Sequence, residues 1–240
     1  AERVNSTVAR VSCIKGVPGE RQVMQDQRGH IIEELNAIRT AQPGQSLELS
    51  IDSRIQNIAY RELKEEFVAR RAKAASVVVL DVNSGEVLAM ANQPSYNPHS
   101  KADMRDFSVL RNRSITDVFE PGSTVKPFTI AAALESGLYK PDTVIETSPG
   151  WMMVSGNEVK DIFNYGTLTT TGVITKSSNI GSTKIALEIG AEPIRDVLGR
   201  VGFGDVLGTG FPGERSGILP NHRRWGRHVT ATFSFGYGLS

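Results

Sequence analysis

The decapeptide Phe-Glu-Pro-Gly-Ser-Thr-Val-Lys-Pro-Phe at residues 119–128 constrains this chain more than any other stretch. Pro121 and Gly122 interrupt an incoming helix or strand. The residues that follow, up to Glu135, are rich in helix formers, and a Ser-Gly pair then ends the run. The pattern therefore predicts a loop that leads into a helix, with Ser123 at or next to the N-cap.

Ser123 and Lys126 lie three positions apart, so a helix would place their side chains on one face. A serine hydroxyl is a weak nucleophile until a base takes its proton, and a lysine can be that base if burial and the helix N-terminus lower its pKa. A helix cap followed by a solvent-facing lysine is the alternative. The Ser-x-x-Lys motif by itself favours that alternative, so the rest of the sequence has to decide.

A second motif, Ser177-Ser178-Asn179, lies further along the chain. A hydroxyl and a side-chain amide can relay a proton and hold a peptide-like substrate. Taken alone, the motif would be an ordinary Ser/Asn turn. Together with the decapeptide it favours a serine acyl-transfer site.

With both motifs present, the sequence resembles the penicillin-binding proteins, and within them the class B peptidoglycan D,D-transpeptidases of the FtsI type, which act in bacterial septal cell-wall synthesis. The resemblance implies an α/β chain with the fold of penicillin-binding-protein transpeptidases and serine β-lactamases, an antiparallel sheet flanked by helices plus a helical subdomain. It covers residues 51–56, 80–94, 111–128, 176–179, 210–214 and 233–239.

The resemblance also implies roles for individual residues. Ser123 would form the acyl-enzyme and Lys126 would accept its proton. Ser177 would pass the proton to the leaving D-alanine, and Asn179 would hold the donor peptide. The substrate-binding residues that it implies are Glu120, Ser178 and Tyr237, although Tyr237 would equally fit an ordinary core aromatic.

Expected ligands are peptidoglycan stem peptides that end in D-Ala-D-Ala, and β-lactam antibiotics that acylate the same serine. The family also implies division partners in the membrane, such as an FtsW-type glycosyltransferase. Two alternatives stay open. A D,D-carboxypeptidase or serine β-lactamase would resolve the acyl-enzyme with water, and a non-catalytic sensor or scaffold would only bind β-lactams or proteins.

One family element is missing from the sequence. No Lys-[Ser/Thr]-Gly triplet follows an apolar strand, and the Arg-Ser-Gly at residues 215–217 has the surroundings of a loop. In the family that strand supplies one of the two backbone donors of the oxyanion hole. We therefore expect residues 46–240 to be the N-terminal portion of a transpeptidase domain, incomplete at its C-terminus. Residues 1–45 would be part of a small non-catalytic pedestal.

Composition excludes several other classes of protein. The net charge of +1 is far from the excess of basic residues that is typical of nucleic-acid-binding proteins. The 4 histidines lack metal-ligand spacing, so we expect no metal and no cofactor. No apolar run approaches the roughly 20 residues that span a bilayer. The family is held at the inner membrane by an N-terminal helix with its catalytic domain in the periplasm, and we expect the same of the complete protein.

Local patterns predict the elements around the motifs. Residues 47–51 alternate as a strand, and Ser53 with Gln56 forms a capping box before a helix. Two apolar runs around an Asn-Ser-Gly-Glu turn predict a hairpin whose first strand is buried. Residues 151–171 fit an irregular, partly helical segment. Helices are predicted at residues 180–189 and 193–201.

Overall fold

The computed structural model describes residues 14–221 and 225–240. The chain divides into two compact units, of which the first runs to Thr116 and includes Gly208–Glu214. The second comprises Asp117–Leu207 and Arg215–Ser240, and it contains every predicted site residue. The boundary expected after residue 45 stays a prediction, and the first thirteen residues of the expected pedestal lie outside the described residues.

The first unit begins with the antiparallel hairpin of β1 (Glu20–Gln25) and β2 (Ile31–Arg39). Its turn is closed by Asp26, whose carboxylate accepts hydrogen bonds from the backbone N–H groups of Arg28 and His30 at 2.8 and 2.9 Å. Every residue of β2 is exposed. The hairpin is therefore held by its ladder and its turn, without an apolar core of its own.

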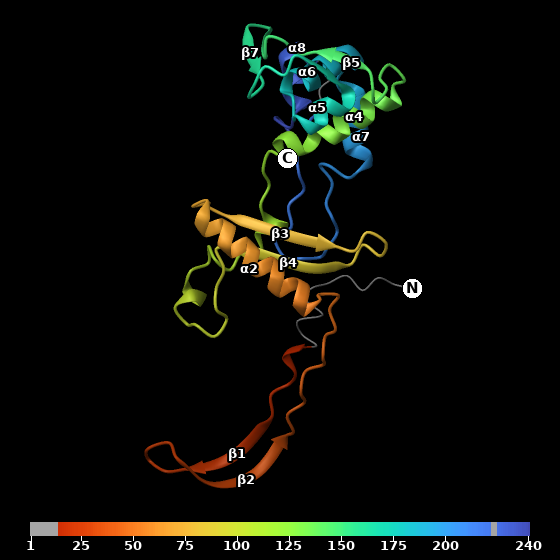
Figure 1. The fold of residues 1–240 in the computed structure, drawn as a ribbon. Coiled ribbons are helices and arrows are strands. Elements are labelled where there is room, and N and C mark those ends of the chain that lie inside the picture. The colour runs from red at the N-terminus through yellow and green to blue at the C-terminus, as the bar shows by residue number, and fades with distance from the viewer. Residues whose placement is uncertain (1–13, 222–224) are drawn as a thin grey trace. The chain divides into compact units, whose positions relative to one another are not determined.

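The same unit holds helix α2 (Ser53–Ala69) and the antiparallel strands β3 (Ala75–Leu80) and β4 (Val87–Gln93). Figure 1 shows α2 lying along this pair. The predicted hairpin is confirmed, but β3 is not a buried strand, because its residues alternate between half-buried and exposed. In the described residues α2 packs on this two-stranded sheet, and Asn112 and Ser114 hydrogen-bond to Asn92 of β4. Short helices complete the unit at Asp103–Arg105 (η1) and Arg113–Thr116 (α3).

Two local predictions near α2 are wrong. Residues 47–51 form no strand. The helix is capped by Asp52 and not by Ser53, since the Asp52 carboxylate accepts from the backbone N–H groups of Arg54 and Ile55. The Gln56 amide instead bonds both backbone groups of Met90 on β4, at 2.8 and 2.9 Å. The Gln56 side chain that a capping box would need is therefore used in a tertiary contact with β4.

The second unit is organised around α4 (Lys126–Glu135), which lies between two apolar clusters. Ala132 packs with residues of α6 (Asn179–Ile189), α7 (Ala191–Arg200) and α8 (Arg227–Phe233). Ile130 and Ala133 pack on the other side, against β5 (Val144–Glu146) and α5 (Thr170–Thr175). The helices predicted at residues 128–135, 180–189 and 193–201 are confirmed. Because α4 contacts an apolar cluster on each of two sides, most of its residues are buried or half-buried, including Lys126 at its start.

Residues 151–171 are more regular than we predicted. Strands β6 (Trp151–Val154) and β7 (Asn157–Lys160) form a hairpin, and β8 (Thr167–Thr169) pairs with β5. The turn between β6 and β7 consists of Ser155 and Gly156, both with positive φ, at 50° and 84°. A two-residue turn of this kind matches the twist of a hairpin, so Ser-Gly was the signal that the periodicity argument missed.

The segment after α8 returns to the start of the serine loop. Gly236 has φ +93°, and its carbonyl accepts a hydrogen bond from the Gly122 N–H at 3.1 Å. A Cβ added at Gly236 would lie 2.0 Å from the Gly122 carbonyl oxygen. The two backbones therefore touch at a point where only glycine fits. Among the described helices none is long and apolar enough to cross a membrane.

The cap of α2 is tested by replacing Asp52 with alanine. Asp52→Ala removes the acceptor of two N-terminal N–H groups, so it should lower the thermal unfolding midpoint by a few degrees. Asp52→Asn keeps an acceptor and should stay close to wild type. Ser53→Ala is the matched control and should leave the unfolding midpoint unchanged. If Ser53→Ala lowered the midpoint more than Asp52→Ala, Ser53 would be the cap after all.

The contact between Gly236 and Gly122 is tested by a pair of alanine substitutions. Gly238 has a similar φ, +81°, but nothing lies within 4 Å of its added Cβ. Gly238→Ala should cost only backbone strain, of order 1–3 kcal/mol. Gly236→Ala adds a clash with backbone and should cost about 1–3 kcal/mol more in unfolding free energy. Equal losses in chemical denaturation would show that the close approach is unimportant.

Candidate active site

Ser123 lies in the 3₁₀ turn η2 (Gly122–Val125), which runs directly into α4. We expected Ser123 at or next to the N-cap, but the N-cap of α4 is Val125, two residues further on, which has no side-chain hydrogen-bonding group. Pro127 lies in the first turn of α4, where its missing N–H costs no hydrogen bond within the helix. Ser123 is exposed, while Val125 is buried. The 3₁₀ turn thus presents the serine at the surface of the unit, one turn before Lys126.

Lys126 is buried, with 1% of its surface exposed. Its Nζ donates to the Ser177 hydroxyl at 2.9 Å and to Asn179 Oδ1 at 2.8 Å. A third bond goes to the Ser177 backbone carbonyl. The two predicted motifs therefore meet, and the lysine joins them.

Two opposing effects set the protonation of Lys126. Removal of the ammonium from water is the larger effect and lowers its pKa, whereas the negative charge of Asp161 raises it. The result is a pKa of about 8, well below the ordinary value for lysine. A substantial fraction of Lys126 is therefore neutral near physiological pH and able to accept a proton.

Ser177 has a backbone conformation that few serines adopt, with φ +53°. Its N–H bonds the Ile174 carbonyl at the end of α5, and α6 starts two residues later. Ser177 itself is exposed. Left-handed backbone at a residue other than glycine costs free energy and persists where the surroundings impose it. Here it turns both the carbonyl and the hydroxyl of Ser177 toward the Lys126 ammonium.

Asp161, directly after β7, holds the other side of this turn. Its Oδ2 accepts from the Ser178 hydroxyl at 2.6 Å. Its Oδ1 accepts from the backbone N–H groups of Asn179 and Ile180. Ser178 is fully buried and also caps α6, accepting from the Gly181 N–H at 2.9 Å. The structure thus places Ser178 beneath the turn, although we predicted that it binds substrate.

The Asn179 amide is oriented at both ends. Its Oδ1 accepts from Lys126, and its Nδ2 donates to the Lys160 carbonyl at 3.0 Å. These two bonds assign the amide oxygen and nitrogen. One N–H and one lone pair are left over, which is what a peptide group of a substrate would use.

Glu120 and Tyr237 lie on the two segments that meet beside Ser123. Glu120 Oε1 accepts from the Gly238 N–H at 2.8 Å, so it ties the serine loop to the segment after α8. Tyr237 is 51% exposed and stacks edge-on against Phe235, with ring centroids 5.8 Å apart. Tyr237 is thus available at the surface and is not a core aromatic. Substrate binding by either residue stays a prediction.

Sequence reasoning missed Asp161 and the Lys160 carbonyl. Neither belongs to a short motif, and both precede Ser177 in a stretch that we expected to be irregular. The Ser-Gly turn of the β6–β7 hairpin could have indicated that a strand ends just before Asp161. Nothing in the sequence alone could have indicated which helix its carboxylate would cap.

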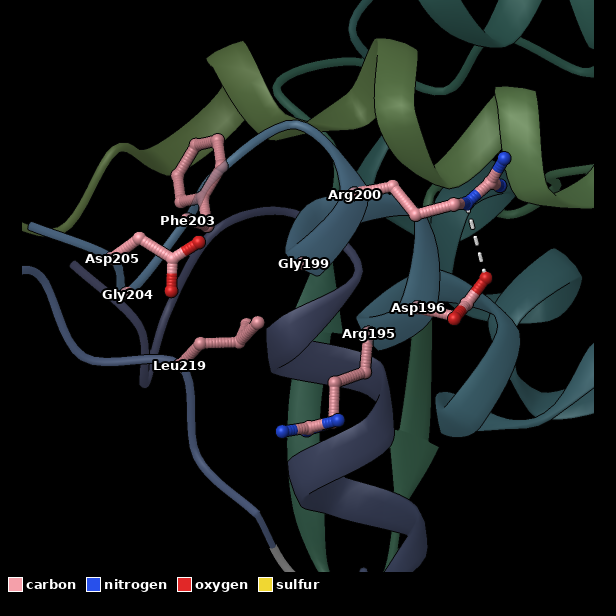
Figure 2. A pocket seen from close by; sticks show the side chains of 8 residues that line it. All are labelled: Arg195, Asp196, Gly199, Arg200, Phe203, Gly204, Asp205 and Leu219. Carbon is pink, nitrogen blue, oxygen red and sulfur yellow. Dashed lines mark ion pairs between the residues drawn. The ribbon is translucent and has the colours of Figure 1, made fainter. Parts of the chain in front are cut away.

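A separate surface cavity of about 400 Å³ lies at the end of α7 (Figure 2). The Arg200 guanidinium pairs with Asp196 at 3.1 Å on one side of it, and Arg195 donates to the Pro220 carbonyl. None of the predicted site residues lines this cavity, so it is distinct from the Lys126 site. Its lining residues are Arg195, Asp196, Gly199, Arg200, Phe203, Gly204, Asp205 and Leu219.

Comparison with known proteins places the chain in a family. Residues 75–240 match the model of the penicillin binding protein transpeptidase domain. The chain is 46% identical to the peptidoglycan D,D-transpeptidase FtsI of Escherichia coli, over 94% of this chain and 38% of that protein. It is 44% identical to the probable peptidoglycan D,D-transpeptidase PbpC of Pseudomonas aeruginosa, over 95% of this chain and 40% of that protein.

Solved structures agree with this match. The transpeptidase domain of Burkholderia pseudomallei penicillin-binding protein 3 superposes with a TM-score of 0.69 at 42% identity, over 82% of this chain and 55% of that one. A Burkholderia ambifaria protein described as a peptidoglycan glycosyltransferase gives a TM-score of 0.71 at 44% identity, over 80% and 56%. The expected fold is confirmed, and the chain belongs to the penicillin-binding protein transpeptidase family, among relatives of the FtsI type.

Proposed function

We propose that this chain carries the acylation machinery of a serine D,D-transpeptidase that cross-links peptidoglycan stem peptides. The observation that carries the proposal is the buried Lys126, which is bound to Ser177 and Asn179 and lies one turn after an exposed Ser123. The chain spans about 40% of the length of the curated relatives named above, so the activity is that of the complete protein.

The reaction is acyl transfer in two steps. Ser123 Oγ attacks the carbonyl carbon of the penultimate D-alanine, and the C–N bond to the terminal D-alanine breaks. The serine proton passes to Lys126, and Ser177 gives its hydroxyl proton to the departing amine and regains one from the Lys126 ammonium, so that both end as they began. An amine of a neighbouring stem peptide then attacks the ester, forms the cross-link and returns Ser123 to its hydroxyl form.

The contacts of Lys126 favour such a relay through Ser177. A charged ammonium has three donors, which match its three acceptors. A neutral amine has two donors and one lone pair, so one of the contacts must reverse or be given up. The Ser177 carbonyl and Asn179 Oδ1 have no proton to give, whereas the Ser177 hydroxyl has one. Deprotonated Lys126 can therefore turn its lone pair toward a serine hydroxyl.

The relatives suggest the setting of this activity. We propose that the complete protein is anchored in the inner membrane with this site in the periplasm, and that it acts at the septum beside an FtsW-type glycosyltransferase. β-Lactams resemble D-Ala-D-Ala and would acylate Ser123. No small leaving group departs from an opened β-lactam, so that adduct would persist.

The nucleophile is tested by mass spectrometry of the complete protein after incubation with a penicillin. Wild type should gain the mass of the drug on the peptide that contains Ser123. Ser123→Ala should gain nothing and keep its fold, because the exposed hydroxyl caps no helix. Ser136→Ala, at the other end of α4, should be labelled like wild type. Labelling of Ser123→Ala would place the nucleophile elsewhere.

The products distinguish transpeptidation from its rivals. With stem peptides and an acceptor amine, the complete protein should yield the cross-linked dimer and free D-alanine. Release of D-alanine without any dimer would indicate a carboxypeptidase, and rapid release of penicilloate a β-lactamase. If the protein neither releases D-alanine nor becomes acylated, it would be a binding protein without enzymatic activity.

The base is tested by the exchange Lys126→Arg. Arginine keeps the charge but cannot give up its proton at accessible pH. General-base catalysis contributes about 10²–10⁴-fold, so the second-order rate of penicillin acylation should fall by that factor.

In wild type the same rate should rise with pH around 8, since Lys126 must lose its proton before it can accept one. If Lys126 ionised like a free lysine, the midpoint of this rise in acylation rate would lie at about pH 10.4.

Lys176→Arg is the matched control for this exchange. Lys176 is exposed and adjacent to Ser177, so it receives the same chemical change outside the contact network. Its acylation rate should equal that of wild type. Circular dichroism of both variants shows whether a slower acylation rate comes from lost catalysis or from an unfolded protein. Near-equal rates for Lys126→Arg and wild type would remove Lys126 from the mechanism.

A further inference from the structure

We propose that Asp161 is a positioning residue of this site: its carboxylate holds the Ser177–Asn179 turn in place and supplies negative charge to the Lys126 ammonium. The inference rests on the proposed function for its catalytic readout. Asp161 acts through Ser177, Ser178 and Asn179 and makes no hydrogen bond to Ser123.

The carboxylate makes three hydrogen bonds, all to consecutive residues of the second motif. Oδ2 accepts from the Ser178 hydroxyl, and Oδ1 accepts from the N–H groups of Asn179 and Ile180. These two N–H groups are among the first of α6, which have no partner within the helix. Asp161 thus fixes where α6 begins, and with it the direction of the side chains of Ser177 and Asn179.

Asp161 is itself held firmly. Its side chain is buried, with 9% of the residue exposed, and its N–H donates to the Gly150 carbonyl at 3.0 Å. The preceding residue, Lys160, supplies the carbonyl that orients the Asn179 amide. The end of the β6–β7 hairpin therefore contacts the turn through both a side chain and a backbone group. A buried carboxylate with this many donors is costly to replace by an apolar residue.

The charge of Asp161 also bears on Lys126. In the part of the chain that the structure describes, Asp161 is the charged group that counteracts the effect of burial on the pKa of Lys126. The other charged or titratable side chains on the surrounding elements are Glu135 on α4, Glu146 on β5, Glu158 and Lys160 on β7, Lys176 before the turn, Lys184 and Glu188 on α6, Glu192, Arg195, Asp196 and Arg200 on α7, and Arg227 and His228 on α8.

Two substitutions separate position from charge. Asp161→Asn can keep its Oδ1 bonds to Asn179 and Ile180, and its amide can donate to the Ser178 oxygen, which has a free lone pair. It therefore removes the charge and keeps the two backbone bonds to α6, while the bond to Ser178 reverses and the Ser178 hydroxyl proton has to find another acceptor. Asp161→Ala removes the charge and all of these bonds. Asp142→Asn, at an exposed position of the same unit, is the matched control.

The measurement is the pH profile of penicillin acylation in the complete protein. Asp161→Ala should acylate up to about 100-fold more slowly across the profile, because small misplacements of reacting groups cost about that much. Asp161→Asn should keep most of the maximal rate but move the midpoint to lower pH, since a raising influence on the Lys126 pKa is lost. Asp142→Asn should match wild type in both rate and midpoint.

A purely structural role predicts a different result. Both Asp161 variants would then lose stability, yet the rate per folded molecule and the midpoint would equal those of wild type, and this outcome overturns the proposal. If Asp161→Ala does not fold, Asp161→Asn decides alone through its midpoint. An unmoved midpoint in Asp161→Asn contradicts the charge effect.

A second readout does not depend on acylation. The Lys126 side chain can be titrated by NMR in protein labelled with ¹³C-lysine, with its signal assigned by its loss in Lys126→Arg. The titration midpoint should be lower in Asp161→Asn than in wild type. If wild type is not acylated at all, the proposed function fails, while this titration still supports or overturns the influence of Asp161.

Discussion

The polar contacts in the second unit depend on the burial of one ammonium group, that of Lys126. Lys126 lies at the start of a helix that is packed between two apolar clusters, and a charge withdrawn from water must find acceptors or lose its proton. Its acceptors come from Ser177 and Asn179, which are far from it in sequence. Their position depends in turn on Asp161 at the end of the β6–β7 hairpin. A chain of polar contacts thus runs from that hairpin through the turn to the lysine.

The serine and the lysine are held by different parts of the unit. The loop before Ser123 is held by the segment after α8, through the close approach of Gly236 to Gly122 and the bond from Gly238 to Glu120. Lys126 is held by the Ser177–Asn179 turn. Since Ser123 is exposed and Lys126 is buried, one turn of backbone separates a solvent-facing hydroxyl from a group whose pKa the protein interior sets.

Prediction from sequence succeeded where the signal was local. The Asn-Ser-Gly-Glu turn predicted its hairpin, and the helical periodicities at residues 180–189 and 193–201 predicted their helices, because packing did not override these signals. It failed where a tertiary contact competed with a local one. Gln56 bonds Met90 in place of its own helix end, and the 3₁₀ turn before Lys126 removes Ser123 from the cap that a regular helix would have given it. The Gln56 side chain had a partner that spacing does not reveal, and the 3₁₀ geometry before α4 is likewise not visible in residue spacing.

The sequence by itself determined the chemical inventory and the family: a serine and a lysine one turn apart, a Ser-x-Asn motif, and long stretches shared with known transpeptidases. These are properties of residue order, which folding does not change. Only the tertiary structure decided that Lys126 is buried, that its three donors are matched by one turn, and that Asp161 lies beneath that turn. Burial and charge proximity depend on contacts between distant segments, and these contacts set the pKa on which a general base relies.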